Sequence, residues 1–129
     1  MRSIQTLIIF ICICNISFAQ DCSRIHIGKF KVVDTKTNTT YSIVRDDSTQ
    51  TEVNSKTGAT FVFKLRWIND CSYGLIPKKN VGPDVNPGVP SDMVLLIKIV
   101  EVKKKYYKTI TTSNKLESAI ELKIEILKP

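Results

Sequence analysis

The sequence predicts an all-β fold, an antiparallel meander of about eight strands that forms a small barrel or a sandwich. Short segments in which apolar and polar side chains alternate, the pattern of a half-buried strand, recur between residues 26 and 127. Polar turn sequences separate these segments at short intervals, which is typical of small antiparallel folds. The sequence therefore indicates little or no helix in the folded domain.

The first 19 residues have the three parts of a secretory signal peptide. Arg2 supplies a positive charge, residues 7–14 form an unbroken apolar run, and small residues at Ser17 and Ala19 precede the predicted cleavage site. This run is shorter than the roughly 20 residues that span a bilayer, which argues against a membrane anchor. Lipid attachment at Cys22 is another alternative, but residues 19–21 match the lipidation pattern poorly. Cleavage after Ala19 would leave residues 20–129 as a single β-rich domain that is secreted or periplasmic.

Five strands are predicted before residue 77. The fourth is the clearest, because Phe61, Phe63 and Leu65 alternate with polar side chains and would bury one face. A hairpin signal at residues 55–58 precedes it. The five predicted strands cover residues 26–33, 41–45, 50–54, 60–67 and 71–75.

Residues 77–92 contain four prolines and two glycines and are predicted to form a long loop outside the sheet. Three strands follow, at residues 94–102, 106–112 and 119–127. The first of these is apolar on both faces, so we expect it to be central and buried on both sides. The last alternates strictly, which favours a strand over a helix that would start at Asn114 with Glu117 completing a capping box.

The apolar faces of these strands form the predicted core. Its side chains are aromatic in the first half of the domain and aliphatic in the second half. The residues predicted to be buried are Phe30, Phe61, Phe63, Leu65, Trp67, Tyr73, Leu95, Ile97, Ile99, Ile120, Leu122 and Ile124.

Two of the four cysteines, Cys12 and Cys14, lie in the predicted signal peptide, and Cys22 and Cys71 remain after cleavage. A pair of cysteines in an exported chain indicates a disulfide. Closing a loop of this length would stabilise the fold by about 4 kcal/mol in the chain-entropy description. Two separate buried thiols are the alternative. Metal binding is not predicted, because His26 is the only other soft ligand.

The whole chain has a formal net charge of +7, and Arg2 is the only charged residue of the predicted signal peptide, so the mature chain carries +6. This balance favours adhesion to anionic surfaces.

We predict a candidate partner surface formed by the long loop and the lysine cluster. The expected partner is an envelope glycan or another exported protein, and nucleic acid is not expected. Its residues are Lys78, Lys79, Asp84, Asp92, Lys103, Lys104, Lys105 and Tyr106. A tether between strands and a solvated turn are the alternatives for these two segments.

The sequence predicts no catalytic site and no cofactor. His26 is the only histidine, so a nucleophile–base pair would have to be built around it. Asp46 and Asp47 are adjacent in a polar turn, where their side chains point apart and stay solvated. The chain has no glycine-rich phosphate loop and no metal-ligand spacing. We therefore interpret His26 as a structural or surface histidine.

Residues 22–75 resemble a family of small secreted proteins of Bacteroidota. The shared pattern is C-x3-H-x-G-x-F at residues 22–30, an arginine at position 45 and W-x3-C-x-Y at residues 67–73. The resemblance implies a secreted domain and brings no activity with it. Some members are labelled topoisomerase IV, but the 110 residues left after cleavage have no room for an ATPase or a DNA gate.

Residues 28–30 also resemble the G-x-aromatic strand that opens lipocalin-like barrels. That resemblance implies that Phe30 closes the barrel floor and that Arg45 covers an aromatic ring by a cation–π contact. From the residues alone, Gly28 permits close backbone approach and Phe30 simply fills the core.

These observations predict an exported, non-enzymatic binding or envelope-associated module. One alternative is a lipocalin-like barrel that binds a small apolar ligand, and another is an enzyme or enzyme inhibitor whose site the sequence does not reveal. A cavity inside the barrel would favour the ligand, and an exposed apolar patch would favour a larger partner.

Overall fold

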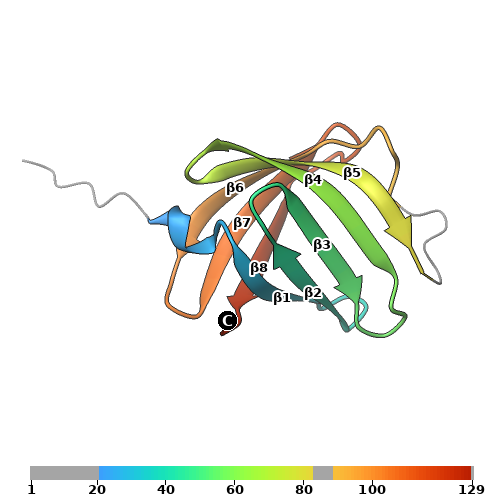
Figure 1. The fold of residues 1–129 in the computed structure, drawn as a ribbon, viewed down its shortest axis with the longest axis horizontal. Helices are drawn as coiled ribbons and strands as arrows, with labels where there is room; N and C mark the ends of the chain where they lie inside the picture. The colour runs from blue at the N-terminus through green and yellow to red at the C-terminus, as the bar shows by residue number, and fades with distance from the viewer. Residues whose placement is uncertain (1–20, 83–88, 129) are drawn as a thin grey trace, which may run out of the picture.

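The computed structural model describes residues 21–82 and 89–128 of the chain. The predicted signal peptide and Asp84 lie outside these residues. Eight antiparallel strands follow one another around a closed barrel, in which β1 pairs with β8 (Figure 1). The predicted all-β meander is confirmed, and of the two architectures left open the structure has the barrel.

Each of the eight predicted strands is present. Residues 119–127, where a helix was the alternative, form a strand, and Asn114 and Glu117 lie in the turn before it. The strands are β1 (Gly28–Asp34), β2 (Thr39–Arg45), β3 (Thr49–Asn54), β4 (Thr60–Asn69), β5 (Ser72–Val81), β6 (Leu95–Val102), β7 (Tyr106–Ser113) and β8 (Ile120–Ile126).

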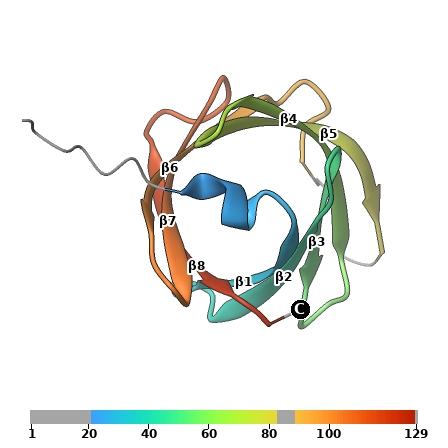
Figure 2. The same cartoon turned by 60° about the vertical axis from the view of Figure 1, so that its left-hand side comes forward.

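Because consecutive strands run in opposite directions, their connections gather at two opposite ends of the barrel. A short 3-10 helix, η1 (Cys22–Ile25), precedes β1 and lies across one end (Figure 2). We call this the η1 end, which also holds the β2–β3, β4–β5 and β6–β7 turns. The opposite, far end holds the remaining connections. The sequence did not predict η1, because a single turn of four residues has no periodic signal.

The inward-facing side chains of the strands form the core. Seven residues predicted to be buried are so, and Phe61, Trp67, Leu95 and Leu122 are partly buried against them. The prediction for Ile120 is wrong: its side chain is 42% exposed, because it starts β8 at the far end, where little packs over it. The confirmed residues are Phe30, Phe63, Leu65, Tyr73, Ile97, Ile99 and Ile124.

The predicted loop at residues 77–92 begins too early, because Pro77 to Val81 continue β5. These residues pair with β4, and a register shift between Val62 and Phe63 accommodates the extra residue Lys78. On its other side β5 pairs with β6 only through Ser72–Leu75. A proline lacks the backbone N–H that a second ladder would use, so Pro77 fits a strand segment that is paired on one side.

The expectation that β6 is buried on both faces is also wrong. Ile97 and Ile99 face the interior, but Leu96 is 48% exposed and Val100 is 37% exposed on the outside of the barrel. An up-and-down barrel has no second layer to cover its outer surface. The outward apolar residues of β6 therefore remain in contact with solvent.

The first and last strands close the barrel with the shortest ladder among the described strand pairs. β1 and β8 pair at two positions, Phe30 with Ile126 and Lys31 with Glu125. The backbone N–H of Leu127 also donates to the carbonyl of Lys29 near the η1 end. Toward the far end, no ladder pairs are formed between these two strands in the described part of the chain. We call this region the β1–β8 seam.

Candidate functional site

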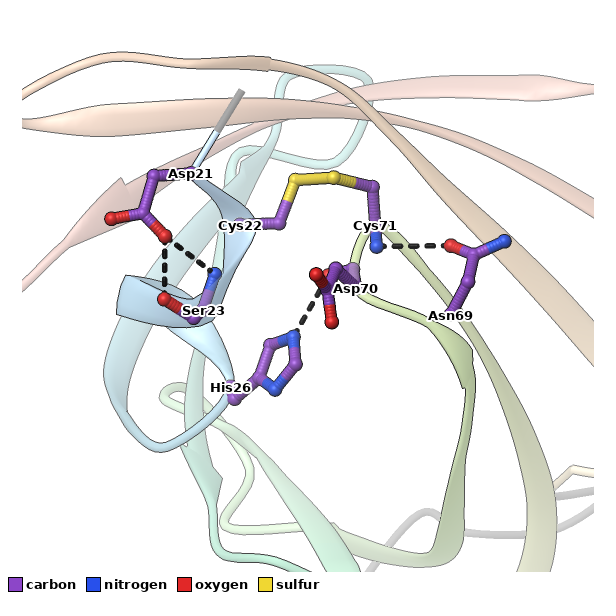
Figure 3. Close-up of a disulfide and its surroundings, with 7 residues drawn as sticks. All are labelled: Asp21, Cys22, Ser23, His26, Asn69, Asp70 and Cys71. Atoms are coloured by element: carbon purple, nitrogen blue, oxygen red, sulfur yellow. Dashed lines mark hydrogen bonds between the residues drawn. A yellow bond between two sulfur atoms is a disulfide. The ribbon is translucent and has the colours of Figure 1, made fainter. Parts of the chain in front are cut away.

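The η1 end is held by a disulfide and by capping hydrogen bonds. Cys22 in η1 is bonded to Cys71 in the β4–β5 turn, which confirms the predicted bridge (Figure 3). The Asp21 carboxylate caps η1 by accepting from the backbone N–H and the hydroxyl of Ser23. The guanidinium of Arg24 reaches the carbonyl oxygens of the β6–β7 turn. The helix is thus attached to two of the three turns at its end of the barrel.

His26 has a structural position, as its sequence context predicted. Its ring lies flat on Trp67, with the ring centroids 3.6 Å apart. Its Nε2 lies 2.8 Å from the carbonyl oxygen of Asp70 (Figure 3). A carbonyl oxygen only accepts, so Nε2 carries the proton and donates it. This nitrogen is therefore engaged with the backbone, and Cys22 nearby is oxidised.

Arg45 is the largest fully buried side chain in the described part of the chain, with 1% of its surface exposed. Its Nε donates to Gln50 Oε1 over 2.8 Å, and its Nη1 donates to the carbonyl of Ile25 over 2.6 Å. Its Nη2 donates to the hydroxyls of Tyr73 and Tyr107, over 3.0 and 2.9 Å. A buried guanidinium is stable only when such donors are satisfied.

Aromatic rings enclose the same guanidinium. The Arg45 Cζ atom lies 4.7 Å from the ring centroids of both Phe30 and Tyr73. The cation–π contact that the lipocalin resemblance implied is therefore present. Gly28 lies opposite Arg45 in the β1–β2 ladder, and a Cβ atom there would come within 3.2 Å of the Phe30 ring. Glycine is favoured here because side chains rarely adopt its backbone φ of 152° and because an added Cβ would crowd the Phe30 ring.

An acidic side chain completes the interior network. Glu52 Oε1 accepts from Gln50 Nε2 over 2.8 Å, so one amide links the carboxyl to Arg45. Burial raises the pKa of Glu52, opposed by the Gln50 hydrogen bond and by the positive charge of Arg45. Burial likewise raises the pKa of Tyr73 and Tyr107, so both phenols stay neutral at physiological pH. We interpret this network as the structural centre of the η1 half of the barrel.

The predicted partner surface is divided between the two ends. Lys78 and Lys79 lie in the half of β5 toward the far end, where Asp92 forms an ion pair with Lys115 over 2.7 Å. The lysine cluster lies at the η1 end, in the β6–β7 turn. There Lys103 pairs with Glu101. Tyr106 packs under the Nζ of Lys123. The two groups therefore do not form one continuous surface, and their binding role stays a prediction.

The outer side of β4, β5 and β6 carries a different charged surface. Five cationic side chains project from it and none forms an ion pair within residues 21–82 and 89–128. Three apolar side chains lie among them, with Leu96, Ile76 and Val94 exposed by 48, 44 and 39%. Only Lys78 and Lys79 belong to the surface predicted from the sequence. We name this surface the basic face; its residues are Lys64, Arg66, Lys78, Lys79 and Lys98 with Ile76, Val94 and Leu96.

Cross-strand pairing explains how the basic face is assembled. Lys64 lies opposite Ile76, and Arg66 lies opposite Gly74, which in turn lies opposite Leu96. Gly74 has no side chain, so bare backbone separates the arginine from the leucine. A surface hollow of about 410 Å³ adjoins this row and is lined by Ser48, Thr49, Lys64, Ile76, Pro77 and Lys78. The alternation of β4 predicts that Lys64 and Arg66 face outward, but only the registers of β4 with β5 and of β5 with β6 show that they lie near Leu96 and Lys98.

Comparison of the chain with protein-family models, with curated proteins and with solved structures gave no match. Both family resemblances therefore stay predictions.

Within the described residues, no three histidine, cysteine, aspartate or glutamate side chains come together in a way that could hold a metal ion. None of the helices there is long and apolar enough to cross a membrane.

Proposed function

We propose that this chain is an exported, non-enzymatic binding module that holds an anionic partner on its basic face. The observation that carries the proposal is the combination, on β4–β6, of exposed apolar side chains with cations that form no ion pair in the described part of the chain. Contiguous exposed apolar surface in a small domain commonly marks an interaction site. The cations add attraction for a negatively charged partner and speed its association.

The interior supports a binding role over a catalytic role. Arg45 uses Nε and both terminal nitrogens in hydrogen bonds, and the single histidine is stacked on Trp67. These groups stabilise the barrel and leave the outer surface for recognition. The disulfide is compatible with an oxidising compartment, which agrees with export.

Chromatography on immobilised heparin, an anionic polysaccharide, tests the proposal. The mature chain, residues 20–129, is compared with the variant K64Q/R66Q/K98Q on the basic face. The matched control K29Q/K36Q/K128Q removes the same charge from exposed residues elsewhere. We expect the basic-face variant to elute at clearly lower salt than the control. Equal elution of the two variants would show that only net charge matters and would contradict the proposal.

A second candidate function, binding of a small and mainly apolar ligand inside the barrel, is favoured by Thr109. This residue faces the interior and is 1% exposed, yet its hydroxyl has no hydrogen-bond partner among the described residues. It lies opposite Leu122 on β8, next to the β1–β8 seam. A buried hydroxyl without a partner requires an explanation, and a ligand with one polar group would supply it.

Titration with the neutral fluorescent probe N-phenyl-1-naphthylamine separates the two candidates. A barrel ligand site predicts saturable binding that Leu122→Trp abolishes by filling the interior, whereas Leu96→Trp on the outside leaves it unchanged. Absence of saturable binding to the wild-type chain would contradict this second candidate. The probe has no charge, so the result does not depend on the basic face.

A further inference from the structure

We propose that the anionic partner of the basic face is the surface of a lipid bilayer that contains anionic lipids. The barrel would lie on its side, with the outer surfaces of β4, β5 and β6 toward the headgroups. This inference rests on the proposed function, because it names the partner of the same face.

The spacing of the cations favours an extended anionic plane. Lys64 and Arg66 project from β4, Lys78 and Lys79 from β5, and Lys98 from β6, so the charges cover the width of three strands. Glu101, the only acidic residue of these strands, is engaged by lysines outside the face. A layer of lipid phosphates can meet all five cations simultaneously, whereas an isolated carboxylate meets one or two. Basic clusters beside a membrane gain affinity additively from each such contact.

The apolar residues of the face suit shallow insertion between headgroups. Leu75 lies opposite Leu95 in the β5–β6 ladder, so the outward residues Ile76, Val94 and Leu96 are neighbours. They are aliphatic and moderately exposed, and the flanking lysines can extend their methylene stems along them toward the phosphates. Stable attachment of a peripheral protein usually needs two signals, and here an apolar patch accompanies a basic one.

The basic face has no aromatic side chain, which argues against a nucleic acid or an acidic protein as the partner. The aromatic side chains of β4 and β5, Phe61, Phe63, Trp67 and Tyr73, belong to the inward-facing rows and pack in the core. β6 has no aromatic residue. The face therefore lacks rings on which bases could stack. Protein interfaces are enriched in aromatic residues and depleted in lysine, the reverse of this composition. Lipid phosphates require neither stacking nor a specific pocket.

Vesicle co-sedimentation of the mature chain tests the inference. The chain is mixed with vesicles of phosphatidylcholine alone or of phosphatidylcholine with phosphatidylglycerol. We expect binding only to the anionic vesicles, weakened strongly when the salt concentration is raised. K64Q/R66Q/K98Q should lower the partition coefficient on the order of a hundredfold, because three membrane-facing charges are lost. The control K29Q/K36Q/K128Q should lower it by a few-fold at most.

A second variant separates a membrane from a soluble polymer. I76S/L96S keeps every charge and removes the apolar part of the face, on exposed positions whose replacement should leave folding intact. We expect this variant to bind anionic vesicles several-fold more weakly while its retention on heparin is unchanged. Equal vesicle binding by I76S/L96S and by the wild type would overturn the insertion of these residues.

Failure of the inference and failure of the proposed function give different results. If the basic face retains the chain on heparin but anionic vesicles bind no better than neutral ones, the partner is a different anionic molecule and only the membrane is overturned. If K64Q/R66Q/K98Q behaves like the control in both measurements, the basic face is not a binding site and both proposals are overturned.

Discussion

The guanidinium of Arg45 on β2 donates a hydrogen bond to the hydroxyl of Tyr107 on β7, although the two residues are 62 positions apart in the sequence. The same Nη2 holds Tyr73 on β5, and Nη1 holds the backbone of η1. Its Nε holds Gln50 on β3, so one side chain connects four strands and the helix across the barrel. The alternation of residues along each strand predicts which side chains face inward. It does not predict that Arg45, Tyr73 and Tyr107 meet, because their meeting depends on closure of the barrel.

Replacement of Arg45 by methionine should strongly destabilise the protein. Methionine is similar in length but cannot donate, so the buried Tyr73 and Tyr107 hydroxyls, Gln50 and the Ile25 carbonyl lose a partner. Each buried polar group left without a hydrogen bond costs about 1–3 kcal/mol, so we expect a loss of at least about 3 kcal/mol. Urea unfolding followed by Trp67 fluorescence measures this change.

Arg66→Met is the matched control, because Arg66 lies on the outside of β4 and is exposed. It should change the free energy of unfolding by no more than about 0.5 kcal/mol. If the two methionine variants are equally stable, the Arg45 network does not stabilise the barrel.

Loss of the disulfide should release η1 from the barrel. The double variant C22S/C71S removes a bridge that spans 49 positions, and its free energy of unfolding should fall by about 4 kcal/mol in the chain-entropy description. Because His26 follows η1 and covers Trp67, the emission of Trp67 should also shift to longer wavelength. An unchanged emission maximum and melting temperature would show that η1 stays docked without the bridge.

The alternation of apolar and polar residues predicted most of the strands, because a half-buried strand has a period of two regardless of its neighbours. Strand β6 was instead predicted from a run that is apolar on both faces. Prediction was poorer where tertiary context decides the outcome. Pro77 continues β5 because the β6 ladder has already ended there. The outward apolar residues of β6 suggested a central strand of a layered sheet, but the barrel leaves Leu96 exposed. No local pattern distinguishes these two situations.

The candidate site was predicted only in small part, for the same reason. Lys78 and Lys79 were recognised because they belong to the proline-rich segment, whereas Lys64 and Arg66 on β4 and Lys98 on β6 are single cations that each stand between apolar residues. Their proximity follows from the registers of β4 with β5 and of β5 with β6. A cluster made by register across strands is invisible until the register is known.

Glu52 should make stability fall as pH rises from acid toward neutral. Burial raises its pKa above the ordinary value of 4.5, so the folded chain holds this proton more tightly than the unfolded chain. Its stabilising contribution is complete below pH 4.5 and is lost as pH rises through the raised pKa. Glu52→Gln does not ionise, so the variant should match the wild type near pH 4 and exceed its stability near pH 7.

Urea unfolding of both proteins across this pH range checks the prediction. Glutamine keeps the oxygen that accepts from Gln50, so the interior hydrogen bond survives the substitution. A Glu52→Gln protein that is less stable than the wild type at neutral pH would mean that the carboxylate is favoured by Arg45 more than burial disfavours it.

Leu96 and Ile97 are adjacent on β6 and provide a direct test of the single-layer barrel. Ile97 faces the core and is 5% exposed, whereas Leu96 faces outward and is 48% exposed. Ile97→Ala should lower the free energy of unfolding by about 2–5 kcal/mol, because it removes buried methyl groups and leaves a cavity. Leu96→Ala should change it by no more than about 0.5 kcal/mol, because this side chain is on the outer surface and about half of it is exposed to solvent. Chemical denaturation of the two variants at one pH measures both values. Similar large losses for the two variants would mean that the outside of β6 is covered, for example by a second copy of the chain. Sedimentation at several concentrations would then show an assembly that Leu96→Ala dissociates.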